Sequence, residues 1–118
     1  SIVGRNLLRI LRDDFAAWLP KLSYVKVDAE GYDRSVLETI LPVLREFQPV
    51  VRAEVYRGLK ASERHLLFDL LSGNGYEVFR YQGGANPRGP RVERSKMSAE
   101  KHFDVLAVPK QRCHRLAA

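Results

Sequence analysis

The sequence contains a single cysteine, Cys113, which leaves no internal partner for a disulfide bond. It also contains no apolar run that approaches the ~20 residues needed to span a bilayer. At the N-terminus, no basic segment precedes an apolar stretch and a small-residue cleavage site, so no signal peptide is indicated. These absences argue against a disulfide-stapled secreted domain and a membrane protein, and they predict a cytoplasmic location.

Glycine is scarce at the start of the chain, where Gly4 is the only glycine before Gly31. An α/β domain that binds a nucleotide cofactor begins with a strand, a Gly-rich turn and a helix. No strand is predicted before Gly4, and Gly83 and Gly84 come too late and do not open a helix. We therefore expect this cofactor-binding element to be absent from the chain.

The net positive charge comes from the last third of the sequence. Residues 1–79 contain 11 basic and 11 acidic residues, whereas residues 80–118 contain 9 basic and 3 acidic ones, which accounts for the net charge of +6. The basic residues surround a Gly/Pro-rich stretch and have no interleaved aromatic residues of the kind that stack on bases. We interpret this segment as a solvated loop and tail, and nucleic-acid binding is not expected.

Composition and length predict one globular domain. The 118 residues are 45% hydrophobic and 29% charged, which is ordinary for a folded protein. Residues 1–110 are assigned to the domain and residues 111–118 to a basic tail.

Apolar periodicity predicts alternating helices and strands. Helices are expected at 5–19, 33–47 and 62–72, and strands at 23–28, 50–56, 76–81 and 102–108. A kink or a restarted helix is expected at Pro42, and a loop at 83–90. This alternation favours an α/β fold with parallel βαβ units. Because no helix joins the last two strands, one of them should run antiparallel at the edge of a mostly parallel sheet.

The first two predicted strands share one pattern of two apolar residues, a base, an apolar residue and an acid. It occurs as Tyr24-Val25-Lys26-Val27-Asp28 and again as Val50-Val51-Arg52-Ala53-Glu54. If these strands are parallel neighbours in matching register, both acids lie at the edge where open α/β sheets bind ligands. Glu30 adds a third acid there, and Gly31 permits a sharp turn.

Two interpretations of these acids remain open from spacing alone. Clustered carboxylates repel one another, so one should have a raised pKa and could accept a proton from a substrate hydroxyl. Alternatively, Asp28 and Glu54 pair with Lys26 and Arg52 in an ordinary lattice of ion pairs.

Four landmarks resemble the FkbM-type family of S-adenosylmethionine-dependent methyltransferases. They are Val25-Lys26-Val27-Asp28-Ala29-Glu30-Gly31-Tyr32-Asp33, Gln48-Pro49-Val50-Val51-Arg52-Ala53-Glu54, Gly75-Tyr76-Glu77-Val78-Phe79 and Phe103-Asp104-Val105-Leu106-Ala107-Val108-Pro109. The similarity covers roughly residues 20–110. It implies a partial Rossmann-like sheet, flanked by helices, in which this chain supplies the fourth to seventh strands of the complete domain.

The resemblance also implies an activity, which is methyl transfer to a hydroxyl of a sugar or other small molecule. Asp28 matches an acid beside the methionine end of S-adenosylmethionine and the acceptor, and Gly31 belongs to the same cofactor-binding motif. Glu30 and Glu54 match acids that shape the catalytic site, and no metal is implied. Because the cofactor half is expected to be absent, the isolated chain is predicted to be inactive.

An interaction module is the alternative function. The edge of the strand at 24–28 would be unpaired in this chain and could support a homodimer or bind a partner segment. The three histidines and Cys113 lack metal-ligand spacing and are predicted to be non-catalytic; the histidines are His65, His102 and His114. The loops after Gly31 and Tyr56 are expected to line an acceptor pocket.

Overall fold

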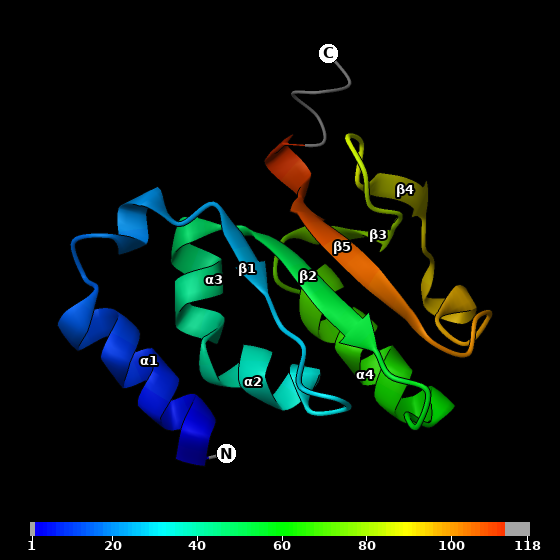
Figure 1. Ribbon diagram of the computed structural model, residues 1–118, viewed down its shortest axis with the longest axis horizontal. Helices are drawn as coiled ribbons and strands as arrows, with labels where there is room; N and C mark the ends of the chain where they lie inside the picture. Colours follow the sequence, from blue (N-terminus) through cyan, green and yellow to red (C-terminus); the bar gives the residue numbers. More distant parts are fainter. Residues whose placement is uncertain (1, 113–118) are drawn as a thin grey trace.

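A computed structural model describes the backbone of residues 2–112 and the side chains of residues 7–112, so Cys113, His114 and most of the predicted tail lie outside it. These residues form a five-stranded sheet with the order β1-β2-β5-β3-β4 (Figure 1). The strands are β1 (Tyr24–Lys26), β2 (Val50–Val55), β3 (Tyr76–Tyr81), β4 (Arg88–Arg91) and β5 (Phe103–Pro109). Within the described chain, no helix is both long and apolar enough to cross a membrane.

Strand direction confirms the α/β class and corrects the predicted sheet. β1 and β2 are parallel, whereas the pairings of β2 with β5, β5 with β3 and β3 with β4 are antiparallel. The expectation of a mostly parallel sheet with an antiparallel edge strand was therefore wrong. The antiparallel β5 lies inside the sheet, where it separates β2 from β3.

The sequence of β5 explains its central position. Val105, Leu106, Ala107 and Val108 are all buried, although consecutive strand residues point to opposite faces of the sheet. Such a continuous apolar run is typical of a strand in the interior of a sheet, and β5 lies between β2 and β3. The chain returns to this place without a helix, so β5 runs opposite to both neighbours.

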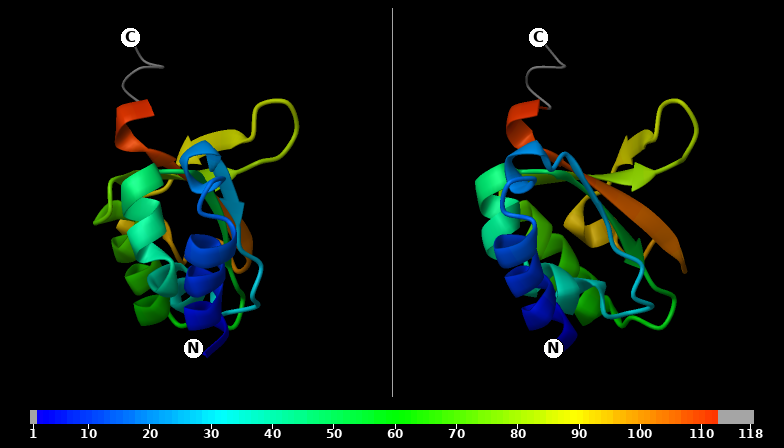
Figure 2. Two further views of the ribbon diagram at one scale, coloured as in Figure 1. Left: turned by 90° about the vertical axis from the view of Figure 1, so that its left-hand side faces the viewer. Right: turned by 60° about the vertical axis from the view of Figure 1, so that its left-hand side comes forward.

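Three of the four described helices cover one face of the sheet, which Figure 2 shows from two directions, and the first helix packs against the second beside the edge of β1. The four helices are α1 (Ile2–Asp14), α2 (Asp33–Thr39), α3 (Leu41–Phe47) and α4 (Ala61–Ser72), with 3-10 turns η1 (Leu19–Lys21) and η2 (Arg94–Lys96). Their apolar residues pack on alternate residues of β2, and this core includes Leu37, Leu44, Leu67, Leu71, Val51, Ala53 and Val55. The remaining residues of β2, which are Val50, Arg52 and Glu54, therefore face away from the helices.

The ends of the elements differ from the predicted ones where local signals were ambiguous. The chain breaks between α2 and α3 at Ile40, and Pro42 lies in the first turn of α3, so the helix restarts there, which is one of the two predicted outcomes. The first helix ends at Asp14, which leaves Phe15 47% and Trp18 64% exposed instead of buried. The stretch 83–90 was predicted as loop throughout, but it includes the start of β4.

Candidate active site

The parallel pair β1–β2 brings Asp28 and Glu54 together. Their register pairs Lys26 with Arg52, and the amide of Val27 donates to the carbonyl oxygen of Arg52 at 2.9 Å. This is the register that the repeated sequence pattern predicted. Continued by two residues, it places the two acids side by side, where Asp28 raises the pKa of Glu54.

Asp33 extends this arrangement with a third carboxyl group. It is 2% exposed, and its Oδ1 accepts a hydrogen bond from the Ala29 amide at 2.9 Å while its Oδ2 accepts one from the Glu54 amide at 2.7 Å. In a regular parallel ladder, the Glu54 amide would donate to the carbonyl oxygen of Val27. The Asp33 carboxyl group takes that place after β1 has ended, so it fixes the loop to β2.

Asp33 is the first residue of α2, but it does not cap that helix. Tyr32 is the N-cap residue of α2, and no side chain caps that end. The bonds of Asp33 instead hold the backbone on both sides of the acidic pair. Burial raises the pKa of Asp33, and the negative charges of Asp28 and Asp104 raise it further against the lowering effect of the two backbone donors.

Glu54 is the most constrained member of the acidic pair. Its side chain is 13% exposed, and its Oε1 is buried without a hydrogen-bond donor among the described residues. Burial raises its pKa first, followed by the hydrogen bond and negative charge of Asp28 and by the charge of Asp33. The negative charge of Asp28 beside Glu54 thus favours the protonated form of the Glu54 carboxyl group.

His102 lies on the other side of Glu54. The amide of Arg57 donates to His102 Nδ1 at 3.2 Å, which leaves Nε2 to face Glu54. This nitrogen lies 3.5 Å from Glu54 Oε2. The ring of Tyr56 packs edge-on against the imidazole with 5.7 Å between centroids, which further limits its orientation.

The alternative lattice of ion pairs within each strand is not formed. Arg52 Nε donates to Asp104 Oδ2 at 2.7 Å, and its guanidinium stacks 3.8 Å from the ring centroid of Tyr81. Among residues 7–112, neither Asp28 nor Glu54 forms an ion pair with Lys26 or Arg52. The acidic pair is therefore not neutralised by the bases of its own strands.

Glu30 and Gly31 lie in the turn after β1, beside a separate hollow. Both have positive φ, 46° for Glu30 and 99° for Gly31, and glycine adopts such a conformation without strain. The hollow has a volume of about 250 Å³, and its lining includes the predicted loops: Glu30, Gly31, Tyr32, Tyr56, Gly58, Leu59 and Glu63. The structure thus places Glu30 at this hollow. Tyr56 connects the two places, since it lines the hollow and contacts His102.

The sequence did not indicate His102 as part of the site. His102 precedes the first residue of β5, and the antiparallel pairing of Glu54 with Asp104 brings it to the sheet face that carries Glu54. This position follows only from the place of β5 beside β2. The other described histidine, His65, is in α4 and takes no part in the site.

The chain matches no protein-family model, no curated protein sequence and no solved structure. The arrangement of its own residues is therefore what supports a function. That arrangement is two neighbouring carboxyl groups, one of them oriented by a histidine, at the carboxyl edge of two parallel strands.

We expect Glu54 to make stability fall as pH rises. A carboxyl group whose pKa is higher in the folded chain than in the unfolded chain binds more protons when folded, so its contribution is complete below the unfolded value and is lost above the folded one. For Glu54 this loss begins above its ordinary pKa of 4.5. Urea unfolding at a series of pH values should show the decline, and Glu54→Gln should flatten part of it.

Asp33 should keep a residual slope in the Glu54→Gln variant, because its pKa is also raised. Two exposed ion pairs have the opposite effect on the pH dependence of stability: Asp69 with Arg94, and Glu100 with Arg80. Each pair lowers the pKa of its acid, so its contribution to stability is lost as pH falls, not as pH rises. Glu30→Gln, at an exposed carboxylate nearby, is the matched control. A Glu54→Gln profile that coincides with that of Glu30→Gln would contradict the proposed coupling.

Proposed function

We propose that this chain forms the acceptor side of an S-adenosylmethionine-dependent methyltransferase site. In this proposal, Asp28 and Glu54 receive the hydroxyl group of a sugar or another small molecule. The single observation that supports it is the meeting of these two carboxyl groups at the carboxyl edge of β1 and β2. Open α/β sheets bind ligands at this edge.

The residues present are chemically suited to the methionine end of the cofactor. When bound, S-adenosylmethionine supplies an electrophilic methyl group on a positively charged sulfur atom. The neighbouring acids Asp28, Asp33 and Glu54 provide negative potential at this edge, and Glu54 Oε1 is a buried acceptor without a protein donor among the described residues. Asp28 and the turn at Gly31 would face this end of the cofactor.

The acidic pair would act on the acceptor by proton transfer. The ionised carboxylate would accept a hydrogen bond from the acceptor hydroxyl and take up its proton. The second carboxyl group would hold the acceptor hydroxyl in place by a further hydrogen bond. His102 orients Glu54 through Nε2 and is a positioning residue in this scheme.

The adenosine end of the cofactor is proposed to be bound by residues outside the described chain. Residues 2–112 contain no strand that leads through a Gly-rich turn into a helix before β1. We therefore expect calorimetric titration of S-adenosylmethionine into residues 1–118 to show no saturation below about 1 mM. No methyl transfer from labelled cofactor to hydroxyl acceptors should be detectable.

The comparison for this experiment is the same chain extended by any coding sequence that precedes Ser1. If that sequence supplies a Gly-rich strand–turn–helix, binding and transfer should appear together. Low-micromolar affinity in residues 1–118 alone would contradict the proposed division of the site.

A second candidate function is self-association or partner binding through the edge of β1. The observation that favours it is the position of β1 at one end of the sheet order. The strand has only three residues, however, and Lys26 is exposed. Short strands and lysine side chains are features that hinder pairing at a sheet edge, so we favour the first function.

A further inference from the structure

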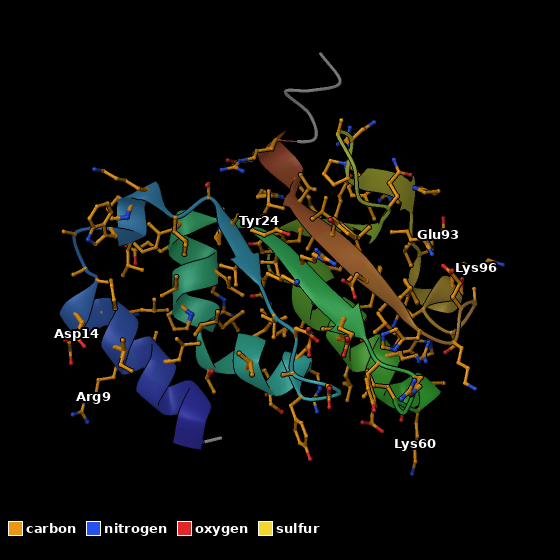
Figure 3. The ribbon with its side chains drawn as sticks, in the orientation of Figure 1. Arg9, Asp14, Tyr24, Lys60, Glu93 and Lys96 are labelled. Carbon is orange, nitrogen blue, oxygen red and sulfur yellow. The ribbon has the colours of Figure 1, made fainter. Side chains whose placement is uncertain are left out.

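A groove of about 740 Å³ lies on the sheet face that the helices leave uncovered. Its lining combines apolar strand residues with a polar loop: Ser23, Tyr24, Val50, Asn86, Pro87, Arg88, Leu106, Val108 and Arg112. It lies at the start of β2, where Val50 lines it. Val50 precedes Glu54 by four residues, a separation of about 13 Å along a strand. Figure 3 labels Tyr24 at the start of β1 and Lys60 before α4, near the two opposite ends of the sheet. The groove is therefore separate from the acidic pair.

The loop between β3 and β4 forms one wall of this groove. Gly83 and Gly84 both have positive φ, 74° and 73°, which lets the chain reverse. The loop is closed by a bond from the Gln82 amide to the Pro87 carbonyl oxygen at 3.0 Å and by one from Gln82 Nε2 to the Asn86 carbonyl oxygen at 2.7 Å. Figure 2 shows this hairpin extending on the side of the sheet away from the helices. The wall is thus held by the chain's own hydrogen bonds.

Most basic residues near this hairpin are already neutralised. Three ion pairs join Arg80 Nη2 to Glu100 at 2.9 Å, Arg91 to Glu77 at 3.8 Å and Arg94 to Asp69 at 2.9 Å. Arg88 and Arg112 differ, because neither forms an ion pair with any acid in residues 7–112. Arg88 instead stacks its guanidinium 5.0 Å from the ring centroid of Phe79.

We propose that the groove binds a small ligand with an apolar body and a single anionic group, such as an aromatic or fatty carboxylate. Val50, Leu106 and Val108 provide the apolar floor, and the volume lies in the range typical of small-molecule sites. The two unneutralised guanidiniums at the rim provide the complementary charge. A guanidinium binds a carboxylate through two parallel hydrogen bonds, which favours an anion over a neutral ligand of the same shape.

The test uses a matched pair of fluorescent probes on residues 1–118. Anilinonaphthalene sulfonate has an aromatic body with one negative charge, and phenylnaphthylamine is its neutral counterpart. We expect saturable binding of the anionic probe at one site per chain. The double variant Arg88→Gln/Arg112→Gln should weaken that binding about tenfold or more, because it removes charge-assisted hydrogen bonds, and should leave the neutral probe unchanged. Each single variant should show a smaller loss in the same direction.

Arg57→Gln is the control, since Arg57 is also an exposed arginine near an aromatic ring but lies after β2, at the other end. It should bind both probes as the unaltered chain does. Decanoate and naphthoate should both displace the anionic probe, whereas the neutral alcohol decanol should not. The stronger of the two carboxylates as a competitor shows whether the groove prefers a fatty or an aromatic ligand. The proposal is overturned if the anionic probe does not saturate, or if the double variant and Arg57→Gln have equal affinities for it. These outcomes do not depend on methyl transfer, so they leave the function proposed for the acidic pair unaffected.

Discussion

Replacement of Asp33 by alanine should lower the free energy of unfolding by about 3 kcal/mol, as expected for the loss of two hydrogen bonds to a charged group. The two donors are the amides of Ala29 and Glu54, at 2.9 and 2.7 Å. Alanine would leave the Glu54 amide without its partner next to a well-packed core. It would also free the loop that positions Asp28, so the effect on the chain should be large.

Urea denaturation followed by circular dichroism would measure this change. Asp33→Asn should give an intermediate loss, because one oxygen still accepts a hydrogen bond while the amide nitrogen faces a backbone donor. Glu38→Ala is the matched control in the same helix: its ion pair with Arg34 is solvent-exposed, so its loss should stay below about 1 kcal/mol. Equal unfolding midpoints for Asp33→Ala and Glu38→Ala would refute this account of the loop.

The sequence predicted the helices and most strands because their signals are local. Apolar spacing within a segment reports which face is buried, and Pro42 restricts its own backbone wherever it occurs. The first helix shows where such reasoning fails. Phe15 and Trp18 continue the apolar spacing, yet the helix ends at Asp14 and both side chains are exposed. The spacing alone did not indicate whether the sheet extends far enough to cover them.

Strand order could not be obtained in the same way, because it depends on contacts between distant segments. The absence of a helix before the last strand correctly indicated an antiparallel direction. It did not indicate that this strand lies between β2 and β3. The run Val105 to Val108 contained a usable signal, since four consecutive apolar residues are typical of a strand buried on both faces.

The residues of the candidate site also fall into those that the sequence predicted and those that only the tertiary structure reveals. Asp28 and Glu54 were predicted to meet because the repeated pattern defines both strands and their register. The role of Asp33 depends on the early end of β1, which exposes a strand amide that a side chain then binds. The role of His102 depends on the place of β5 beside β2. The roles of Asp33 and His102 both depend on tertiary structure, which the spacing of residues in the sequence does not predict.

Substitution of either member of the acidic pair should nearly abolish methyl transfer in a polypeptide that contains this chain and binds the cofactor. Asp28→Asn and Glu54→Gln each remove a carboxylate from the proposed proton acceptor, and loss of general base catalysis typically costs a factor of about 100 to 10,000. The reduction should appear in kcat with labelled S-adenosylmethionine and a hydroxyl acceptor. Glu77→Gln, on the same sheet but paired with Arg91, is the control and should retain activity.

His102 provides the measurement that separates positioning from a purely structural contribution. The imidazole lowers the pKa of Glu54 against the raising effect of burial and Asp28. His102→Gln removes that influence, so the pKa of Glu54 should rise further and the acidic limb of the pH–rate profile should move to higher pH. Glu54→Gln would eliminate the limb if Glu54 is the titrating group. If His102→Gln lowers the rate equally at every pH and leaves the acidic limb in place, the imidazole only packs against the strand. If Asp28→Asn and Glu54→Gln both keep full activity, the acidic pair takes no part in the reaction.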